Sequence, residues 1–200
     1  MKQYYDRRAL EYDATSWELT EAEAAGSRDL AALERLLREL PPARLLDIGC
    51  GTGWLTSRLA GTIVGVDQSE AMLQLARRRV PDALFVRADI PPLPFPDDTF
   101  DRALASHVYG HIDAPEDRAL FVAEALRVAR TLILVEQAWR PPSPRESLER
   151  RTLRDGSEHL VFKRYFEAAE LAAEVAGEVL LATDTFVAVA TTQPREMERP

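Results

Sequence analysis

The chain has 200 residues, of which 46% are hydrophobic and 29% charged, as is typical of one soluble globular domain. Its formal net charge of −8 argues against a nucleic-acid-binding surface, which is normally basic. Cys50 is the single cysteine, so no intrachain disulfide can form, and no apolar stretch is long enough to span a membrane. These features predict a soluble cytoplasmic protein.

The N-terminal segment mixes aromatic with charged side chains and shows no strand alternation. We expect a helix here, with two interpretations of equal standing: it folds over the mouth of a pocket, or it only packs on the body of the protein. Its aromatic residues are Tyr4, Tyr5, Tyr12 and Trp17.

A second helix is predicted from a capping pattern and from leucine spacing. Thr20 followed by Glu23 has the form of a capping box, and leucines recur at helical intervals over residues 30–40. Pro41 should end this helix.

Residues 43–48 form a short apolar run that predicts a strand buried on both faces. Gly49, Gly51 and Gly53 follow at alternate positions, which frees the main chain to turn sharply and to lie against a ligand. We expect residues 54–60 to continue as a helix whose first N–H groups favour negative charge at the loop.

The glycine spacing discriminates between two ligand classes. A dinucleotide-binding loop has the pattern G-x-G-x-x-G, but its third glycine would fall on Trp54. A nicotinamide-dependent oxidoreductase is therefore disfavoured. The pattern D-x-G-x-G-x-G, which begins at Asp47, resembles the first motif of class I S-adenosylmethionine-dependent methyltransferases. An alternative role for Asp47 is to accept hydrogen bonds from the N–H groups of the loop itself.

Strands and helices then alternate, which predicts a mostly parallel sheet with helices on both faces. Ser69 is placed to cap the helix after the second strand. The further expected strands are 62–66, 83–86, 100–105 and 131–135, and a helix is expected at 116–129.

Acidic residues end successive strands of this sheet. Asp67 follows Asp47 by 20 residues, where a carboxylate can bind both hydroxyls of a ribose. Asp89 ends the third strand and offers an acceptor to an adenine amino group, beside the apolar side chain of Ile90.

Residues 139–165 interrupt the alternation with a proline-rich linker and a hairpin signal. Asp155-Gly156 lies between two strand-like runs, which favours a two-residue turn. This insert is either a lid over the carboxyl ends of the strands, or surface padding or a dimer contact. A helix at 167–176 and an antiparallel pair of strands at 179–182 and 185–190 should follow, and residues 193–200 should form a frayed tail.

Residues 4–192 as a whole resemble the class I methyltransferases, especially the small-molecule branch related to quinone-biosynthesis methyltransferases. The matching motifs are 45–53, 64–67 and 88–101. The resemblance implies a Rossmann-like, doubly wound α/β sheet of seven strands, mostly parallel with an antiparallel last strand. It also implies S-adenosylmethionine as cofactor, with S-adenosylhomocysteine as product.

The resemblance implies a set of cofactor-binding residues and a class of acceptor. The fourth strand leads into Ser106 and His107 without the Asn/Asp-Pro-Pro-Tyr element of nucleic-acid and glutamine methyltransferases, so a small-molecule acceptor is favoured. The Lys-Pro-Gly-Gly turn of the family is replaced by residues 128–131, a structural change only. The implied cofactor-binding residues are Tyr12, Asp47, Gly49, Cys50, Gly51, Gly53, Asp67, Gln68, Met72, Asp89, Ile90 and Ser106.

We therefore predict a single methyltransferase domain over residues 1–200 that methylates an O, N or C atom of a small molecule. Its parts are an N-terminal cap (1–40), a cofactor-binding core (41–138), a lid or hairpin insert (139–165) and a C-terminal helix with a strand hairpin (166–192). The alternative is a non-catalytic cofactor-binding or regulatory protein on the same fold.

Catalytic candidates cluster after the fourth strand. His111 is favoured as a general base with an ordinary pKa of about 6.5, followed by His107, with Tyr109 and Glu136 as further candidates. The 3 histidines lie without clustered carboxylates or cysteines, so no metal site is expected. We expect no nucleic-acid or membrane partner, and the oligomeric state stays open, a homodimer included.

Overall fold

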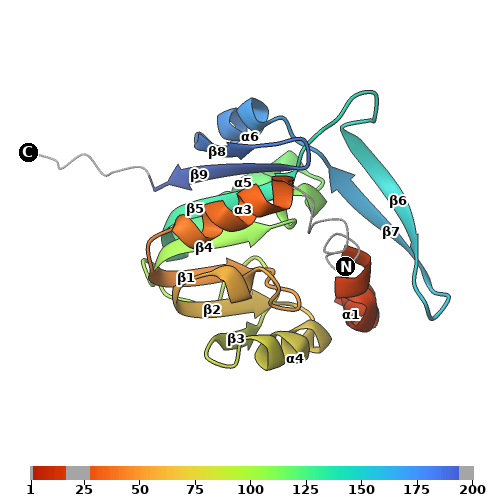
Figure 1. Cartoon of the computed structure of the whole chain (residues 1–200), viewed down its shortest axis with the longest axis horizontal. Helices are drawn as coiled ribbons and strands as arrows, with labels where there is room; N and C mark the ends of the chain where they lie inside the picture. The colour runs from red at the N-terminus through yellow and green to blue at the C-terminus, as the bar shows by residue number, and fades with distance from the viewer. Residues whose placement is uncertain (1, 17–27, 194–200) are drawn as a thin grey trace, which may run out of the picture.

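The computed structural model describes residues 2–16 and 28–193, with side chains described for 2–13 and 28–193. A seven-stranded sheet lies between helices on its two faces (Figure 1). Its strands are β1 (Ala43–Ile48), β2 (Gly61–Asp67), β3 (Leu84–Arg87), β4 (Phe100–Ser106), β5 (Ala129–Gln137), β8 (Glu178–Ala182) and β9 (Phe186–Thr192).

The strand order is β3-β2-β1-β4-β5-β9-β8. The first five strands pair in parallel, whereas β9 runs antiparallel to both β5 and β8. The predicted sheet is thereby confirmed, antiparallel last strand included. Parallel pairing brings the carboxyl ends of β1, β2 and β4 to one edge, where open α/β sheets bind ligands.

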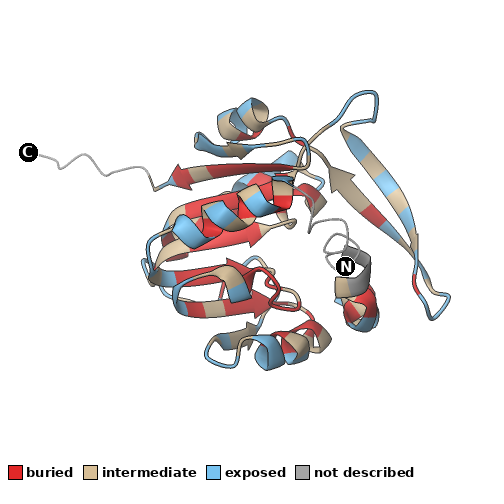
Figure 2. Cartoon of the chain, in the orientation of Figure 1, coloured by how far each residue is buried: buried red, intermediate tan, exposed pale blue. Residues whose placement is uncertain are grey.

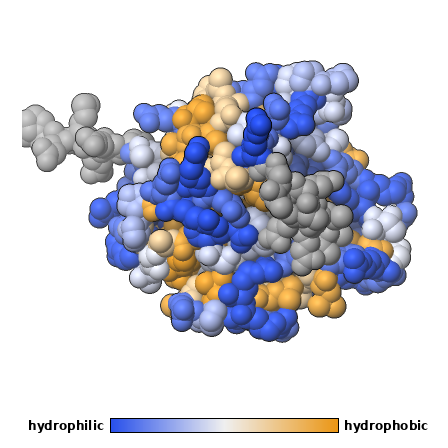
Figure 3. All heavy atoms as spheres, in the orientation of Figure 1, coloured by the Kyte–Doolittle hydropathy of each residue, from blue (hydrophilic) through white to orange (hydrophobic). Residues whose placement is uncertain are grey.

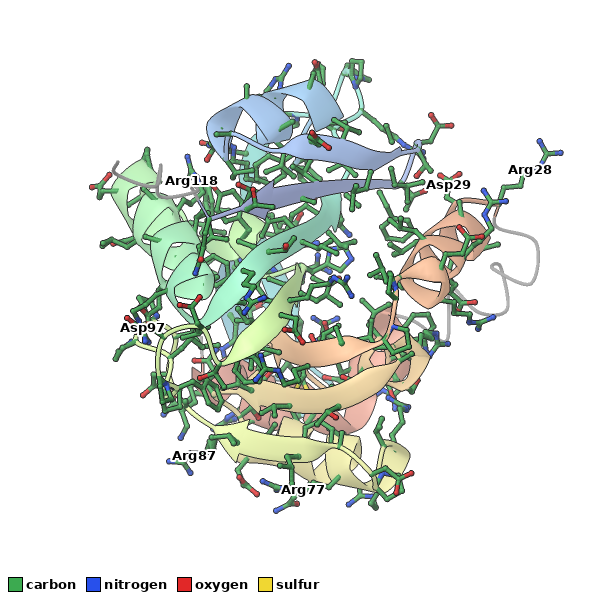
Figure 4. All side chains as sticks on the ribbon, turned by 90° about the vertical axis from the view of Figure 1, so that its left-hand side faces the viewer. Arg28, Asp29, Arg77, Arg87, Asp97 and Arg118 are labelled. Carbon is green, nitrogen blue, oxygen red and sulfur yellow. The ribbon has the colours of Figure 1, made fainter. Side chains whose placement is uncertain are left out.

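Apolar residues of the central strands alternate between two cores, one on each face of the sheet. These strands are largely buried, as Figure 2 shows. Leu45 of β1 belongs to one core and its neighbour Leu46 to the other. The helices that carry Asp29 and Arg118 lie on opposite sides of the sheet (Figure 4). The helices are α1 (Lys2–Ser16), α3 (Arg28–Glu39), α4 (Glu70–Arg79), α5 (Pro115–Val128) and α6 (Ala168–Glu174), with 3-10 turns η1 (Thr56–Arg58) and η2 (Tyr109–His111).

The chain stays irregular after the glycine loop, where a helix at 54–60 was predicted. Only the short turn η1 forms there, so the prediction is wrong. The carbonyl of Trp54 accepts hydrogen bonds from Ser57 Oγ (2.7 Å) and Arg58 Nη1 (2.6 Å), and the amide of Arg58 bonds Leu55 instead. Ser57 N–H makes one α-helical hydrogen bond, to the Gly53 carbonyl (3.0 Å), but the ladder goes no further, because Arg58 N–H bonds Leu55 rather than Trp54. The expected helix is therefore missing from the end of the loop.

The predicted hairpin consists of β6 (Glu146–Thr152) and β7 (Glu158–Arg164), but its turn is longer than predicted. Gly156 N–H donates to the Leu153 carbonyl (2.9 Å), and Leu153 N–H donates to the Ser157 carbonyl (2.9 Å). Three residues, 154–156, thus form the turn. Gly156 ends it with φ +80°, the arrangement of a turn followed by a left-handed residue.

Helix α1 packs on this hairpin, beyond the carboxyl ends of β1, β2 and β4 (Figure 1). Tyr4 is buried against Leu153 and Val161, and Arg154 N–H donates to the Glu11 carboxylate (3.2 Å). Arg7 Nη1 also lies 3.1 Å from Asp155 Oδ2. Helix and hairpin therefore form one wall over the edge of the sheet.

The face of the molecule in Figure 3 is mostly hydrophilic and carries scattered hydrophobic residues. Within the described ranges, no helix has the length and apolar character needed to cross a membrane. Trp17, the capping box of Thr20 with Glu23, and the tail beyond Gln193 lie outside the described residues.

Candidate active site

Two neighbouring hollows lie where α1 and the hairpin meet the carboxyl edge of the sheet. The glycine-loop cavity, of about 140 Å³, is lined by Gly49, Gly51 and Asp67 among others. The hairpin cavity, of about 310 Å³, is lined by residues of α1, η2, β5 and β7. Four side chains line both cavities and so form their common boundary: Tyr5, Tyr12, His107 and His111.

The glycine loop has the conformation that its sequence predicted. Gly49 and Gly51 have φ values of +70° and +53° and line the glycine-loop cavity. A Cβ at Gly49 would lie 2.5 Å from Val108 Cγ2, whereas a Cβ at Gly51 would meet no atom within 4 Å. Bare main chain at Gly51 therefore borders open space. Gly53 lines none of the described cavities and packs against Ala76 instead.

Asp67 joins the glycine loop to the start of α4. Its Oδ2 accepts from Gly51 N–H (3.0 Å) and its Oδ1 from Ser69 N–H (2.8 Å). Burial raises the pKa of the carboxyl, and the N–H donors oppose that shift. The main chain of Gln68 adds a further hydrogen bond to this carboxyl, and the lone-pair capacity that remains on the two oxygens is available to a ligand in the cavity. Gln68 and Met72, both predicted site residues, line the same cavity.

Asp47 lies deeper, beside a small third hollow that is also lined by Cys50. Thr56 Oγ1 donates to Asp47 Oδ2 at 2.5 Å, and burial raises the pKa of the carboxyl to about 6. The alternative role for Asp47 assigned its hydrogen bonds to loop N–H groups, but the partner found is a hydroxyl. The Cys50 thiol is buried, which raises its pKa and leaves it protonated.

The loop after β3 separates two residues that were predicted to act together. Ile90 lines the glycine-loop cavity, but Asp89 is exposed and lines none of the described cavities. The strand ends at Arg87, two residues before Asp89, so the aspartate lies in the loop rather than at the strand terminus.

Ser106 ends β4 and lines both the glycine-loop cavity and the third hollow. Its Oγ is buried, and no hydrogen-bond partner for it exists within the described part of the chain. An unpaired buried hydroxyl is unfavourable. A ligand that formed a hydrogen bond with it would therefore gain the full free energy of that bond, because no existing hydrogen bond would have to be broken. This orphan hydroxyl, beside the open main chain at Gly51, is the feature that fits a bound polar ligand.

The two histidines are placed at the boundary of the cavities, but not with ordinary pKa values. Burial lowers the pKa of His107 to about 3 and also lowers that of His111. His111 Nδ1 lies 2.7 Å from the Phe162 carbonyl, so this nitrogen carries the proton and Nε2 is the basic atom. The predicted base is therefore neutral, and its expected pKa of about 6.5 is wrong.

Tyr109 and Glu136 differ in where they point. Tyr109 Oη donates to Glu174 (2.8 Å), away from the cavities, which removes it as a catalytic candidate. Glu136 lines the hairpin cavity and accepts from Tyr109 N–H (2.8 Å). Burial raises the pKa of Glu136 to about 8, although hydrogen bonds from three backbone N–H groups act to lower that pKa.

Sequence reasoning missed the basic lining of the hairpin cavity. One signal was available, because Lys163 is one of only two lysines in a chain with 25 basic residues. The basic residues lining this cavity are Arg8, Arg151, Lys163 and Arg164.

Comparison with known proteins agrees with this geometry. Residues 46–131 match the family model described as a methyltransferase domain. A demethylmenaquinone methyltransferase of Renibacterium salmoninarum is 33% identical over 129 residues, which cover 63% of this chain and 52% of that enzyme. The chain thus spans about half the length of this curated relative.

Solved structures match over nearly the whole chain. A structure described as a DhpI-SAH complex is 28% identical with a TM-score of 0.74, and covers 96% of this chain and 95% of its own. A second, described as a DhpI-SAM-HEP complex, is 27% identical with the same TM-score and the same coverage. The resemblance to S-adenosylmethionine-dependent methyltransferases seen in the sequence is confirmed.

Proposed function

We propose that this chain, a methyltransferase of the S-adenosylmethionine-dependent fold with its matching domain at residues 46–131, transfers a methyl group to a small-molecule acceptor. The observation that carries the proposal is the junction of two cavities at the carboxyl edge of the sheet. One cavity has the glycine loop, Asp67 and the unpaired Ser106 hydroxyl. The other is large enough for a separate small molecule.

The glycine-loop cavity is the proposed cofactor site. Asp67 would accept hydrogen bonds from the ribose hydroxyls, and Ser106 would bond a polar group of the cofactor. Ile90 and Met72 would contact its adenine ring. Gly51 would leave room for the methionine part, beside the main chain of Gly49. Asp47 and Cys50 line the third hollow beside the loop, and Gly53 packs the loop against Ala76. Tyr12 covers the cavity from α1.

The chemistry needs alignment and exclusion of water more than it needs activation. S-adenosylmethionine supplies a methyl group that its sulfonium already activates. The protein then has to hold the acceptor atom in line with the methyl–sulfur bond, which is a matter of proximity and orientation. Tyr5 and Tyr12 close the boundary between the cavities on the α1 side. His111 Nε2 is the proposed base for an acceptor atom that carries a proton.

Two alternatives are weaker. A nicotinamide enzyme would need a small residue at Trp54, but this side chain is 4% exposed and packs in the core with α3. A non-catalytic binding protein would use the glycine-loop cavity but would have no need of a second cavity joined to it.

We further propose one methyltransferase domain over residues 1–200 and a cytoplasmic location, the latter because the single cysteine is free and buried. A small molecule is the proposed acceptor rather than nucleic acid, since the relative from Renibacterium salmoninarum is named for demethylmenaquinone and the net charge is −8. The oligomeric state is open to measurement, with a homodimer the first state to test.

Titration calorimetry and labelled-methyl transfer test the function. We expect S-adenosylmethionine and S-adenosylhomocysteine to bind and NAD not to bind. Incubation with methyl-labelled cofactor and a metabolite extract should yield a labelled product, detected by mass spectrometry. Tighter binding of NAD would overturn the cofactor assignment, and cofactor binding without any labelled product would favour the non-catalytic alternative.

A further inference from the structure

The carboxyl end of β5 lies beside the turn that carries the proposed base. Ser106 of β4 pairs with Val135 of β5, and His107 N–H continues this pairing by one bond to the Val135 carbonyl (2.9 Å). Glu136 is therefore the first residue of β5 past its pairing with β4, beside the chain that leaves β4 for η2. Its side chain is buried and lies at the hairpin cavity.

Glu136 binds the main-chain N–H groups of this turn. Tyr109 N–H donates to its Oε1 at 2.8 Å, and the N–H groups of Val108 and Gly110 also bond the carboxylate. Successive N–H groups that point at one anion form a concave anion-binding site, which is filled here by a side chain of the same protein. Hydrogen bonds to a carboxylate are strong, so these three fix the turn relative to β5.

The turn is also confined on the side of the hairpin. A Cβ at Gly110 would lie 2.8 Å from Glu136 Oε2 and 2.8 Å from the Arg164 carbonyl of β7. A side chain at this position would therefore force one of these neighbours to shift. The turn thus lies tightly between the Glu136 carboxylate and the main chain of β7.

His111 follows directly in the chain and contacts β7 through its ring. Its Nδ1 donates to the Phe162 carbonyl at 2.7 Å, which leaves Nε2 as the basic atom. This bond decides which ring nitrogen carries the proton. It also requires the His111 main chain to lie at a fixed distance from β7, which is set by the position of the turn. A neutral histidine without the bond would divide between its two tautomers.

A second anchor holds the same turn through the side chain of Tyr109. The ring is buried and packs against Phe121 and Phe166, and its hydroxyl donates to Glu174 of α6 (2.8 Å). This hydroxyl bond does not involve the main-chain N–H groups that Glu136 binds. Mutation can therefore remove either anchor separately.

We propose that Glu136 is a positioning residue for methyl transfer, whose carboxylate holds the 108–110 turn so that His111 keeps its proton on Nδ1 and can accept the proton of the acceptor on Nε2. This inference rests on the proposed function, because it assigns a role to a residue of the same site. Glu136 acts through the main chain and takes no proton from the acceptor itself. It does not line the glycine-loop cavity, so its replacement should leave the cofactor site unchanged.

Two substitutions at Glu136 remove its acceptors in steps. Glu136→Gln keeps one oxygen for the turn but presents an NH₂ group, which cannot accept, to the remaining N–H groups. Glu136→Leu removes both oxygens and leaves all three N–H groups without their acceptor. Where Glu136→Leu does not fold, Glu136→Gln decides the test.

Two control variants separate this role from other effects. Asp101→Asn makes the same change of carboxylate to amide at the opposite end of β4, where Asp101 Oδ2 accepts from Arg44 N–H (3.0 Å). Tyr109→Phe removes the hydroxyl bond to Glu174 and keeps the N–H that Glu136 binds. The first control tests the chemical change alone, and the second tests the other anchor of the turn.

The experiment reads the tautomer of His111 from long-range ¹H–¹⁵N correlation spectra of protein that is labelled at the histidine nitrogens and saturated with S-adenosylhomocysteine. At about pH 9, Glu136 with its pKa of about 8 is ionised and a free histidine is neutral. His111→Gln assigns the His111 signal by its absence, and His159 on the hairpin serves as an internal reference.

We expect the wild type to hold His111 at least tenfold in excess in the Nδ1–H form. The ratio of the Nδ1–H to the Nε2–H form should fall at least fivefold in Glu136→Gln and further in Glu136→Leu. It should change less than twofold in both control variants, and the His159 signals should stay in place. The affinity for S-adenosylhomocysteine, measured by calorimetry, should change less than threefold in Glu136→Gln.

An unchanged ratio in folded Glu136→Gln would overturn the proposal, as would an equal change in either control variant. A wild type that carries the His111 proton on Nε2 would also overturn it. A larger loss of cofactor affinity in Glu136→Gln would do the same, because the effect would then not be confined to the turn. Absence of S-adenosylhomocysteine binding in the wild type would refute the proposed function instead. The spectra are then recorded without S-adenosylhomocysteine, and the tautomer ratio still decides the role of Glu136.

Discussion

Asp67→Asn removes the group on which the cofactor assignment most depends. The amide keeps one oxygen that can accept from Ser69 N–H, but its NH₂ group cannot accept from Gly51 N–H, which now bonds Oδ2 at 3.0 Å. Loss of charged hydrogen bonds to the ribose should weaken S-adenosylhomocysteine binding by about 1.5–3 kcal/mol, or about 10- to 150-fold. The same substitution leaves a loop N–H unpaired and should lower stability by about 1–3 kcal/mol.

Binding calorimetry well below the melting temperature separates the loss of affinity for S-adenosylhomocysteine from the loss of folding stability. Asp82→Asn serves as the control, because Asp82 is exposed in the turn after α4 and the substitution changes the charge equally. Its affinity for S-adenosylhomocysteine should match that of the wild type. An unchanged affinity in a folded Asp67→Asn protein would refute the reasoning and would move the ribose away from this carboxylate.

Three further variants test the rest of the site. Ser106→Ala should leave the melting temperature unchanged or slightly raised, because the lost hydroxyl is unpaired, and should weaken S-adenosylhomocysteine about two- to tenfold in calorimetry; a clear loss of stability would contradict this. His111→Gln should slow single-turnover transfer to an identified, proton-bearing acceptor at least tenfold with cofactor affinity unchanged, whereas normal turnover would return His111 to a structural role. His107→Asn tests pH dependence. The pKa of His107 is lowered to about 3, so its contribution to stability is lost as the pH falls below about 6.5. Between pH 7 and 5 the wild type should lose about 2 kcal/mol more than the variant in urea unfolding, and parallel losses would refute the burial argument.

The sheet could be predicted because its signals are local. Apolar runs end in Asp67 and other polar residues, and each predicted strand of the sheet lies within two residues of the observed one. The predicted helix after the glycine loop does not form, and the apolar periodicity of the sequence could not show why. The side chains of Ser57 and Arg58 donate hydrogen bonds to the Trp54 carbonyl. Such a capture of main-chain groups by side chains competes with helix formation and has no signature in the apolar pattern.

The acceptor side of the site could not be predicted in the same way. Arg7 and Asp155 are separated by 148 residues in the chain, yet they pair where α1 meets the hairpin. Lys163 and Gln137 likewise come from different elements. Periodicity predicts the elements, but which of their faces meet is decided by tertiary packing. The basic cavity therefore became visible only when both walls were in place.

Helix α1 connects the two halves of the site through its polar side chains. Asp13 Oδ1 accepts from Thr52 Oγ1 (2.6 Å) in the glycine loop, and Asp6 Oδ1 accepts from Ser69 Oγ (2.6 Å), the residue that caps α4 beside Asp67. The same helix packs on the hairpin through Tyr4 and contributes Arg8 to the hairpin cavity. Movement of α1 would therefore alter both cavities together. A cofactor that holds the glycine loop in place would also hold the cationic wall in position for the acceptor.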